Sequence, residues 1–185
     1  MTVSVPAADA IMTPAEFDGW FAGLFEREAF RLELLDCYDS PAARERVQRF
    51  MAGEREGQPA RAFWDGLLAE ARRAGKSMSR VHVVSEPLTN YLRWELDYYR
   101  GSVAAGEDIR IIPRARAAGL DLPGFDFWLF DGRAAAVMVY DERGAWLHSE
   151  IVTDLGFVAA CCHWRDVAMH HATELGTYMA GSEAV

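Results

Sequence analysis

The sequence from Arg80 to Arg114, RVHVVSEPLTNYLRWELDYYRGSVAAGEDIRIIPR, decides the fold. Residues 80–84 are rich in valine and predict a strand. Ser85 and Pro87 then indicate the start of a helix, because a serine cap followed closely by proline suits the first helical turn. The isoleucines within residues 108–112 predict a second strand. This strand–helix–strand unit is the centre around which we assign the other elements.

The segment before this unit, residues 13–75, is predicted to be mainly helical. A capping box at residues 13–16, with proline at the first helical position, predicts a helix through about residue 27. Its many aromatic side chains indicate that it docks on its own domain or on a partner. The further elements predicted here are a short strand within 30–35 and helices over 40–53 and 61–74.

After the central unit the pattern changes to the alternation of strands. Residues 125–130 and 135–140 are predicted to pair through a hairpin turn at Asp131-Gly132. A further strand over 145–152 precedes a closing helix over 154–175. The prediction is therefore an α/β (α+β) fold with a mixed, largely antiparallel sheet of about five strands covered by helices.

The predicted organisation is a single domain with short flexible ends. The domain spans 13–175, and its sheet-forming part spans 80–152. Residues 1–12 are predicted to be a flexible arm and residues 176–185 a flexible tail.

Composition restricts the location and the partners. The 185 residues carry a formal net charge of −9, which disfavours direct binding of nucleic acid. No apolar run approaches the roughly 20 residues of a membrane span, and no signal peptide is recognisable. The three cysteines read as buried thiols in a reducing compartment. We expect a cytoplasmic protein with no membrane association, whose oligomeric state is left open.

The central helix carries the first candidates for chemistry. Tyr91 and Glu95 lie four residues apart, so they share one face of the helix. In a pocket, Glu95 could act as a general base and Tyr91 as a hydrogen-bond donor, with Asp108 as a further candidate catalytic residue. The alternative is a solvated face with ordinary charge pairs.

Further polar residues around the unit are candidate ligand-binding groups. Arg93 and Arg110 could recognise an anion, although a simple salt bridge from Arg110 to Asp108 or Glu107 is equally compatible with the sequence. Asp126 and Trp128 share one face of their strand, which is compatible with a pocket. The predicted ligand-binding residues are Glu86, Arg93, Glu107, Arg110, Asp126 and Trp128.

The sequence predicts neither a metal site nor a cofactor. Cys162, Asp166 and His170 recur every four residues, but such a stripe is more often an exposed helix face than a metal site. No nucleotide-binding, zinc-protease or nucleophile-elbow motif occurs.

Four motifs carry a resemblance to a known family. They are FRLE at 30–33, VVSEPLTNYLR at 83–93, AGEDIR at 105–110 and FDFWLFD at 125–131. Together they resemble an uncharacterised actinobacterial family, a domain of unknown function often encoded beside helix-turn-helix regulators, over roughly residues 28–175. More loosely, the strand order is similar to the phospholipase-D-like half-domain. The catalytic His-x-Lys motif of that superfamily is absent, because Lys76, the single lysine, has no histidine two residues before it.

Two functions follow as hypotheses. The first is an accessory or regulatory protein that binds a small anionic ligand or a partner protein through residues 80–114. The partner would be a helix-turn-helix regulator or a pathway enzyme. The alternative is a cofactor-independent enzyme of specialised metabolism, with a carboxylate base, a tyrosine donor and an arginine anion clamp.

Overall fold

The structure is a computed structural model that describes residues 4–55 and 58–182. Its centre is one eight-stranded sheet in the order β1-β7-β6-β5-β2-β3-β4-β8. The strands are β1 (Ala10–Met12), β2 (Glu28–Glu33), β3 (Ser77–Val84), β4 (Asp108–Pro113), β5 (Phe127–Phe130), β6 (Ala134–Tyr140), β7 (Trp146–Val152) and β8 (Thr173–Glu174).

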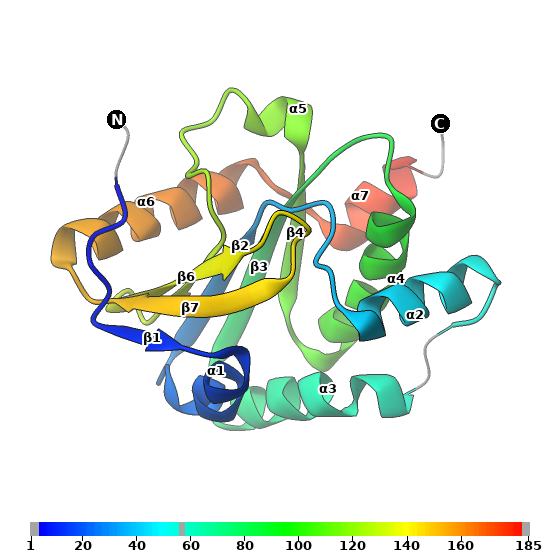
Figure 1. The fold of residues 1–185 in the computed structure, drawn as a ribbon. Helices are drawn as coiled ribbons and strands as arrows, with labels where there is room; N and C mark the ends of the chain where they lie inside the picture. Colours follow the sequence, from blue (N-terminus) through cyan, green and yellow to red (C-terminus); the bar gives the residue numbers. More distant parts are fainter. Residues whose placement is uncertain (1–3, 56–57, 183–185) are drawn as a thin grey trace.

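Helices cover both faces of this sheet (Figure 1). On one face α6 packs on a core that includes Phe127 and Trp164. On the other face α1, the following 3₁₀ turn and α3 cover one half, and α4 with α7 covers the other. The helices are α1 (Pro14–Trp20), α2 (Pro41–Met51), α3 (Gln58–Arg73), α4 (Asn90–Ala105), α5 (Arg114–Ala117), α6 (Leu155–His171) and α7 (Leu175–Ser182), with the 3₁₀ turn η1 at Phe21–Gly23.

The predicted fold class is confirmed, and the number of strands is corrected. The sheet is mixed: β2 pairs with β3 and β3 with β4 in parallel, whereas the other pairs are antiparallel. It has eight strands rather than about five. The edge strands β1 and β8 span three and two residues, too short to show an alternating pattern.

Several predicted boundaries differ from the structure. The central helix begins at Asn90, after the cap Thr89, rather than at Ser85 or Pro87, and the closing helix ends at His171 rather than at residue 175. The first helix ends at Trp20 rather than near residue 27, because the chain must extend into β2 from Glu28. Residues 10–12 of the predicted arm form β1. Much of the predicted tail forms α7, which is anchored by the buried side chains of Leu175 and Tyr178. Residues 1–3 and 183–185 of the predicted arm and tail lie outside the described residues.

Local sequence signals explain the elements that position the site. The capping box of α1 is present as predicted. Thr89 caps α4 through the N–H of Leu92, and Gly106 ends this helix with a φ of 115°. At the predicted hairpin turn, Asp131 and Gly132 both have positive φ, as a type I′ turn requires.

The carboxylate of Asp131 also joins distant parts of the chain. It accepts hydrogen bonds from the backbone N–H groups of Glu26, Arg27 and Glu28 at 2.6–2.8 Å. The start of β2 is therefore fixed against the turn between β5 and β6. Among the described residues, no helix is long and apolar enough to cross a membrane.

Candidate functional site

The site begins with polar residues on the central strands. Arg31 on β2 lies opposite Arg80 on β3 and Trp128 on β5, and Glu33 lies opposite His82. Because strand side chains alternate between faces, all five project from the same face of the sheet. That face is the one covered by α3 and α4, so charged groups are enclosed where apolar side chains would be expected.

These charges are neutralised by one another. Glu33 accepts hydrogen bonds from Arg31 Nε and from Arg80 Nη1, each at 2.8 Å. Arg80 Nε donates to Glu107 at 2.9 Å, and Trp64 Nε1 donates to the second oxygen of Glu107 at 3.0 Å. Burial raises the pKa of Glu33, but the charges of Arg80 and Arg31 outweigh burial and hold that pKa well below its usual value.

The electrostatic environment of Glu95, on α4, is the opposite of that of Glu33. Its Oε1 accepts a hydrogen bond from Tyr91 at 3.1 Å. Its Oε2 is buried and has no hydrogen-bond partner among the described residues. Burial, together with the negative charge of Glu33, raises the pKa of Glu95 well above its usual value. Two carboxyl groups of one site therefore have pKa values pushed apart, Glu33 toward the ionised form and Glu95 toward the protonated form.

His82 lies between these two carboxyl groups. Its Nε2 is 2.8 Å from the carbonyl oxygen of Leu35, which can only accept, so Nε2 bears the hydrogen and Nδ1 presents its lone pair. Nδ1 lies 3.5 Å from Oε2 of Glu95. Burial lowers the pKa of His82 and so favours the neutral ring.

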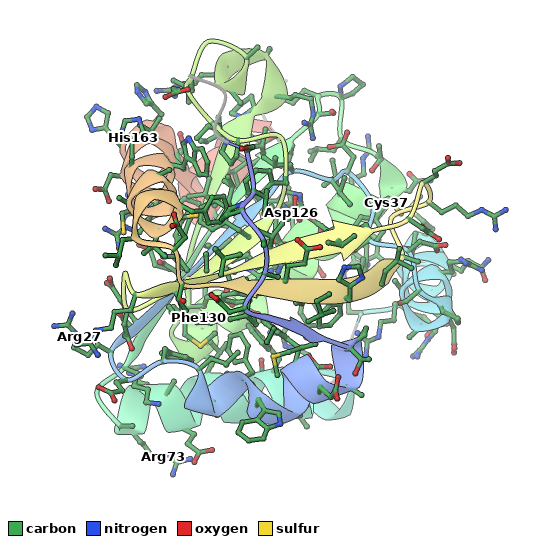
Figure 2. All side chains as sticks on the ribbon, turned by 60° about the vertical axis from the view of Figure 1, so that its left-hand side comes forward. Arg27, Cys37, Arg73, Asp126, Phe130 and His163 are labelled. Atoms are coloured by element: carbon green, nitrogen blue, oxygen red, sulfur yellow. The ribbon has the colours of Figure 1, made fainter. Side chains whose placement is uncertain are left out.

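A second carboxyl group lies on the other side of Arg31. Asp126 accepts hydrogen bonds from the N–H of Leu34 at 2.9 Å and from the hydroxyl of Tyr38 at 2.5 Å. Arg31 Nη2 is 3.7 Å from Asp126 and also donates to the hydroxyl of Tyr140. Burial raises the pKa of Asp126 to about 6. Figure 2 shows Asp126 in the interior of the molecule.

A cavity of about 420 Å³ opens above this network, which is the size of a small-molecule site. Arg31, Glu33, Arg80 and Glu95 line it. Trp146 Nε1, from another lining residue, is also buried with no hydrogen-bond partner among the described residues. The aromatic lining residues are Phe17, Phe21, Tyr38, Trp64, Tyr91, Trp94, Tyr98, Tyr99, Trp128, Tyr140 and Trp146.

Comparison with known proteins identifies a family. The model of the family described as a domain of unknown function, DUF6879, matches residues 15–180. The chain belongs to this family. No match was found among curated proteins. One similar solved structure is the phospholipase D family member Nuc from Salmonella typhimurium, with 8% sequence identity and a TM-score of 0.50. The match covers 89% of this chain and 95% of that one, and at this identity it shows the fold alone.

The fold brings several of the predicted site residues of this DUF6879 member together. Tyr91, Glu95 and Trp128 line the cavity. Glu107 and Asp126 belong to the network beneath it, through Arg80 and Arg31 respectively.

Other predicted residues lie elsewhere. Arg110 on β4 is opposite Val81, whose side chain belongs to the core under α6, so Arg110 projects from the face away from the cavity. It pairs there with Asp108 at 3.0 Å, as the salt-bridge alternative expected. Arg93 is exposed on α4. Glu86 accepts a hydrogen bond from the hydroxyl of Tyr178 at 2.8 Å.

Sequence reasoning missed the floor of the cavity. Arg31, Glu33, Arg80 and His82 were not among the predicted site residues. The sequence did contain a signal. Ionisable residues stand two apart at 31 and 33, and again at 80 and 82, within segments that are otherwise apolar enough for a buried sheet. Charges repeated at this period on neighbouring strands indicate one shared face.

The helical stripe with metal-ligand spacing does not form a cluster. Among residues 4–55 and 58–182, no group of three or more histidine, cysteine, aspartate or glutamate side chains could hold a metal ion. His163, next to this stripe, points outward from α6 (Figure 2).

Proposed function

We propose that this DUF6879 member binds a small molecule in the cavity above the Arg31–Glu33–Arg80 network. The observation that carries the proposal is the pair of buried polar atoms, Glu95 Oε2 and Trp146 Nε1, that have no hydrogen-bond partner within residues 4–55 and 58–182. A buried polar atom that makes no hydrogen bond costs about 1–3 kcal/mol, so native proteins rarely retain one without a reason. A ligand that supplied both partners would remove this cost.

The surrounding residues support the proposal because they are already fixed in place. Glu33 is held by two arginines and by the hydroxyl of Tyr99, which donates at 2.7 Å. The ring of His82 is fixed by its bond to the carbonyl of Leu35. A cavity with preorganised polar groups and aromatic walls loses little conformational freedom when a ligand enters.

The biological setting remains part of the proposal. The sequence predicts an accessory or regulatory role, with a helix-turn-helix regulator or a pathway enzyme as partner. Such a role would use the cavity as a sensor whose occupancy changes the partner-binding surface. Residues 80–114 contribute α4 and part of β3 to the lining of this cavity.

A thermal-shift screen of a small-metabolite library tests the proposal. We expect a bound compound to raise the melting temperature of the wild type, because a ligand stabilises the state that binds it. Trp146→Phe removes the unpartnered N–H and should weaken binding about tenfold.

The matched control is Trp20→Phe, because Trp20 is 67% exposed and does not line the cavity. This variant should bind like the wild type. Compounds that stabilise the wild type and Trp146→Phe equally would contradict the proposal.

The opposed pKa values of Glu33 and Glu95 favour a second candidate, a cofactor-independent enzyme. A protonated Glu95 beside a neutral His82 can donate a proton, and the ionised form that results can take one back. If a compound from the screen is converted, Glu95→Gln should lower the rate of conversion by a factor of about 10²–10⁴ and leave binding measurable.

A further inference from the structure

The network beneath the cavity carries more negative than positive charge. Glu33, Glu107 and Asp126 surround two guanidinium groups, those of Arg31 and Arg80. Each guanidinium already uses two of its three nitrogen atoms in hydrogen bonds inside the network. An anionic ligand would therefore meet arginines whose charge is already balanced.

Glu95 adds a further carboxyl group at the wall. The groups that face it come from its own helix, from two strands and from the loop before α2. They are Tyr91 and Tyr99 on α4, Glu33 and Arg31 on β2, His82 and Arg80 on β3, and Cys37. The nearest of these is the hydroxyl of Tyr91, and His82 is neutral. Oε2 of Glu95 thus lacks the cation that each oxygen of Glu33 has.

The aromatic walls of the cavity already hold cations against ring faces. The guanidinium carbon of Arg31 lies 5.3 Å from the ring centroid of Trp128, and that of Arg80 lies 5.1 Å from the centroid of Tyr99. Near Glu95, Tyr91 and Trp94 meet edge to face at 5.2 Å. Aromatic faces beside a carboxyl group are the environment in which proteins bind organic ammonium ions.

We infer that the cavity takes an organic cation, an amine or guanidine carried on an apolar body, with its charged nitrogen against Oε2 of Glu95. This inference rests on the proposed small-molecule site and specifies its ligand class. The apolar body would lie against the aromatic walls. When an ammonium group binds, Glu95 pairs with it as the carboxylate, so a proton that Glu95 carries before binding leaves to solvent.

Three probes of similar shape and different charge test the inference: 3-phenylpropylamine, 3-phenylpropan-1-ol and 3-phenylpropionate. Binding is measured at pH 7 by quenching of the cavity tryptophans and by titration calorimetry. We expect the amine to bind at least about tenfold more tightly than the alcohol and the carboxylate, the order of a charge-assisted hydrogen bond. Calorimetry in two buffers of different ionisation enthalpy should show release of a proton with the amine alone.

Glu95→Gln provides the matched variant, because the amide has the shape of the protonated acid and cannot become a carboxylate. We expect this variant to bind the amine and the alcohol within about threefold of each other. Glu70→Gln makes the same substitution at an exposed position on α3 and should keep the full preference for the amine.

The inference is overturned if the amine does not bind, if the alcohol or the carboxylate binds as tightly, or if Glu95→Gln keeps the preference. The measurement of proton release on the wild type tests the inference even if Glu95→Gln does not fold. If the alcohol or the carboxylate binds as tightly as the amine and Trp146→Phe weakens that binding, the cation is rejected and the cavity is retained. The cavity itself would be rejected as the binding site if library compounds bound equally well to the wild type and to Trp146→Phe.

Discussion

At the scale of single residues, Glu33 connects three buried polar side chains in the interior. One carboxylate accepts from Arg31, Arg80 and Tyr99. Removing one partner from such a buried network is costly, because the remaining charges lose their compensation and stay out of water. An arginine at the surface has no such consequence.

Arg80→Met and Arg110→Met make this contrast measurable. Both arginines lie on central strands and pair with carboxylates, but Arg80 is buried and Arg110 is partly exposed. We expect Arg80→Met to lower the free energy of unfolding by about 3–5 kcal/mol and Arg110→Met by less than about 1 kcal/mol. Urea denaturation of the two variants is the measurement. Equal losses would show that the network does not behave as a buried unit.

Asp126 should leave a signature in the pH dependence of stability. Its pKa is about 6 in the folded protein and has an ordinary value of 3.8, so between these values the folded state binds more protons than the unfolded state. Its contribution to stability therefore falls as the pH rises from about 4 to 6, by on the order of 2–3 kcal/mol. Glu33 acts in the opposite sense, and its lowered pKa places its loss of stability at more acidic pH.

Asp126→Asn should remove this dependence. The amide can still accept from the N–H of Leu34 and donate to the hydroxyl of Tyr38. We expect the difference in unfolding free energy between the wild type and the variant to change between pH 4 and 6 in favour of the variant at the higher pH. Parallel curves over this range would contradict the raised pKa.

At the scale of elements, two loops are tied together beside the cavity. The N–H of Asp39 donates to the carbonyl of Gly144 at 3.0 Å. Gly144 has a φ of 85°, and a Cβ atom there would lie 2.4 Å from the carbonyl oxygen of Cys37. Because that obstacle is backbone, only glycine allows the loops before α2 and before β7 to approach this closely.

Gly144→Ala should therefore lower the free energy of unfolding by more than the backbone strain of a positive φ alone would. Gly53 has a similar φ of 89° and open space where a Cβ atom would lie. We expect Gly53→Ala to lower the unfolding free energy by about 1 kcal/mol, and Gly144→Ala to lower it by at least about 1–2 kcal/mol more. Thermal or urea denaturation compares the two, and equal effects would contradict the close approach.

Elements with local signals could be predicted from the sequence, and the others could not. The caps of α1 and the turn at Asp131-Gly132 depend on neighbouring residues, so they are visible in the chain itself. The edge strands β1 and β8 and the end of α6 depend on distant partners. Gly176, directly after the predicted end of the closing helix at residue 175, lies inside α7, because packing of Tyr178 outweighs the weak helix propensity of glycine.

At the scale of the whole molecule, the difference between local signals and contacts with distant residues also explains which site residues could be predicted from the sequence. Tyr91 and Glu95 share a helix face, which sequence spacing reveals. Arg31 and Arg80 meet because β2 and β3 pair in one register, and nothing in the 48 residues between them reveals that register. Arg110 is excluded from the cavity by the register between β3 and β4, because a shift of one residue along β4 moves a side chain to the other face of the sheet.

The position of β2 between β3 and β5 has a consequence for synthesis of the chain. β2 leaves the ribosome well before its partner β5, which begins at Phe127, and Glu107 also follows β2 much later. Until those residues emerge, Arg31 and Glu33 lie on a strand with one open side, and Arg80 lacks its second carboxylate. Nascent chains that end before β5 therefore cannot complete the interior, and they present an open strand edge on which they can associate with one another.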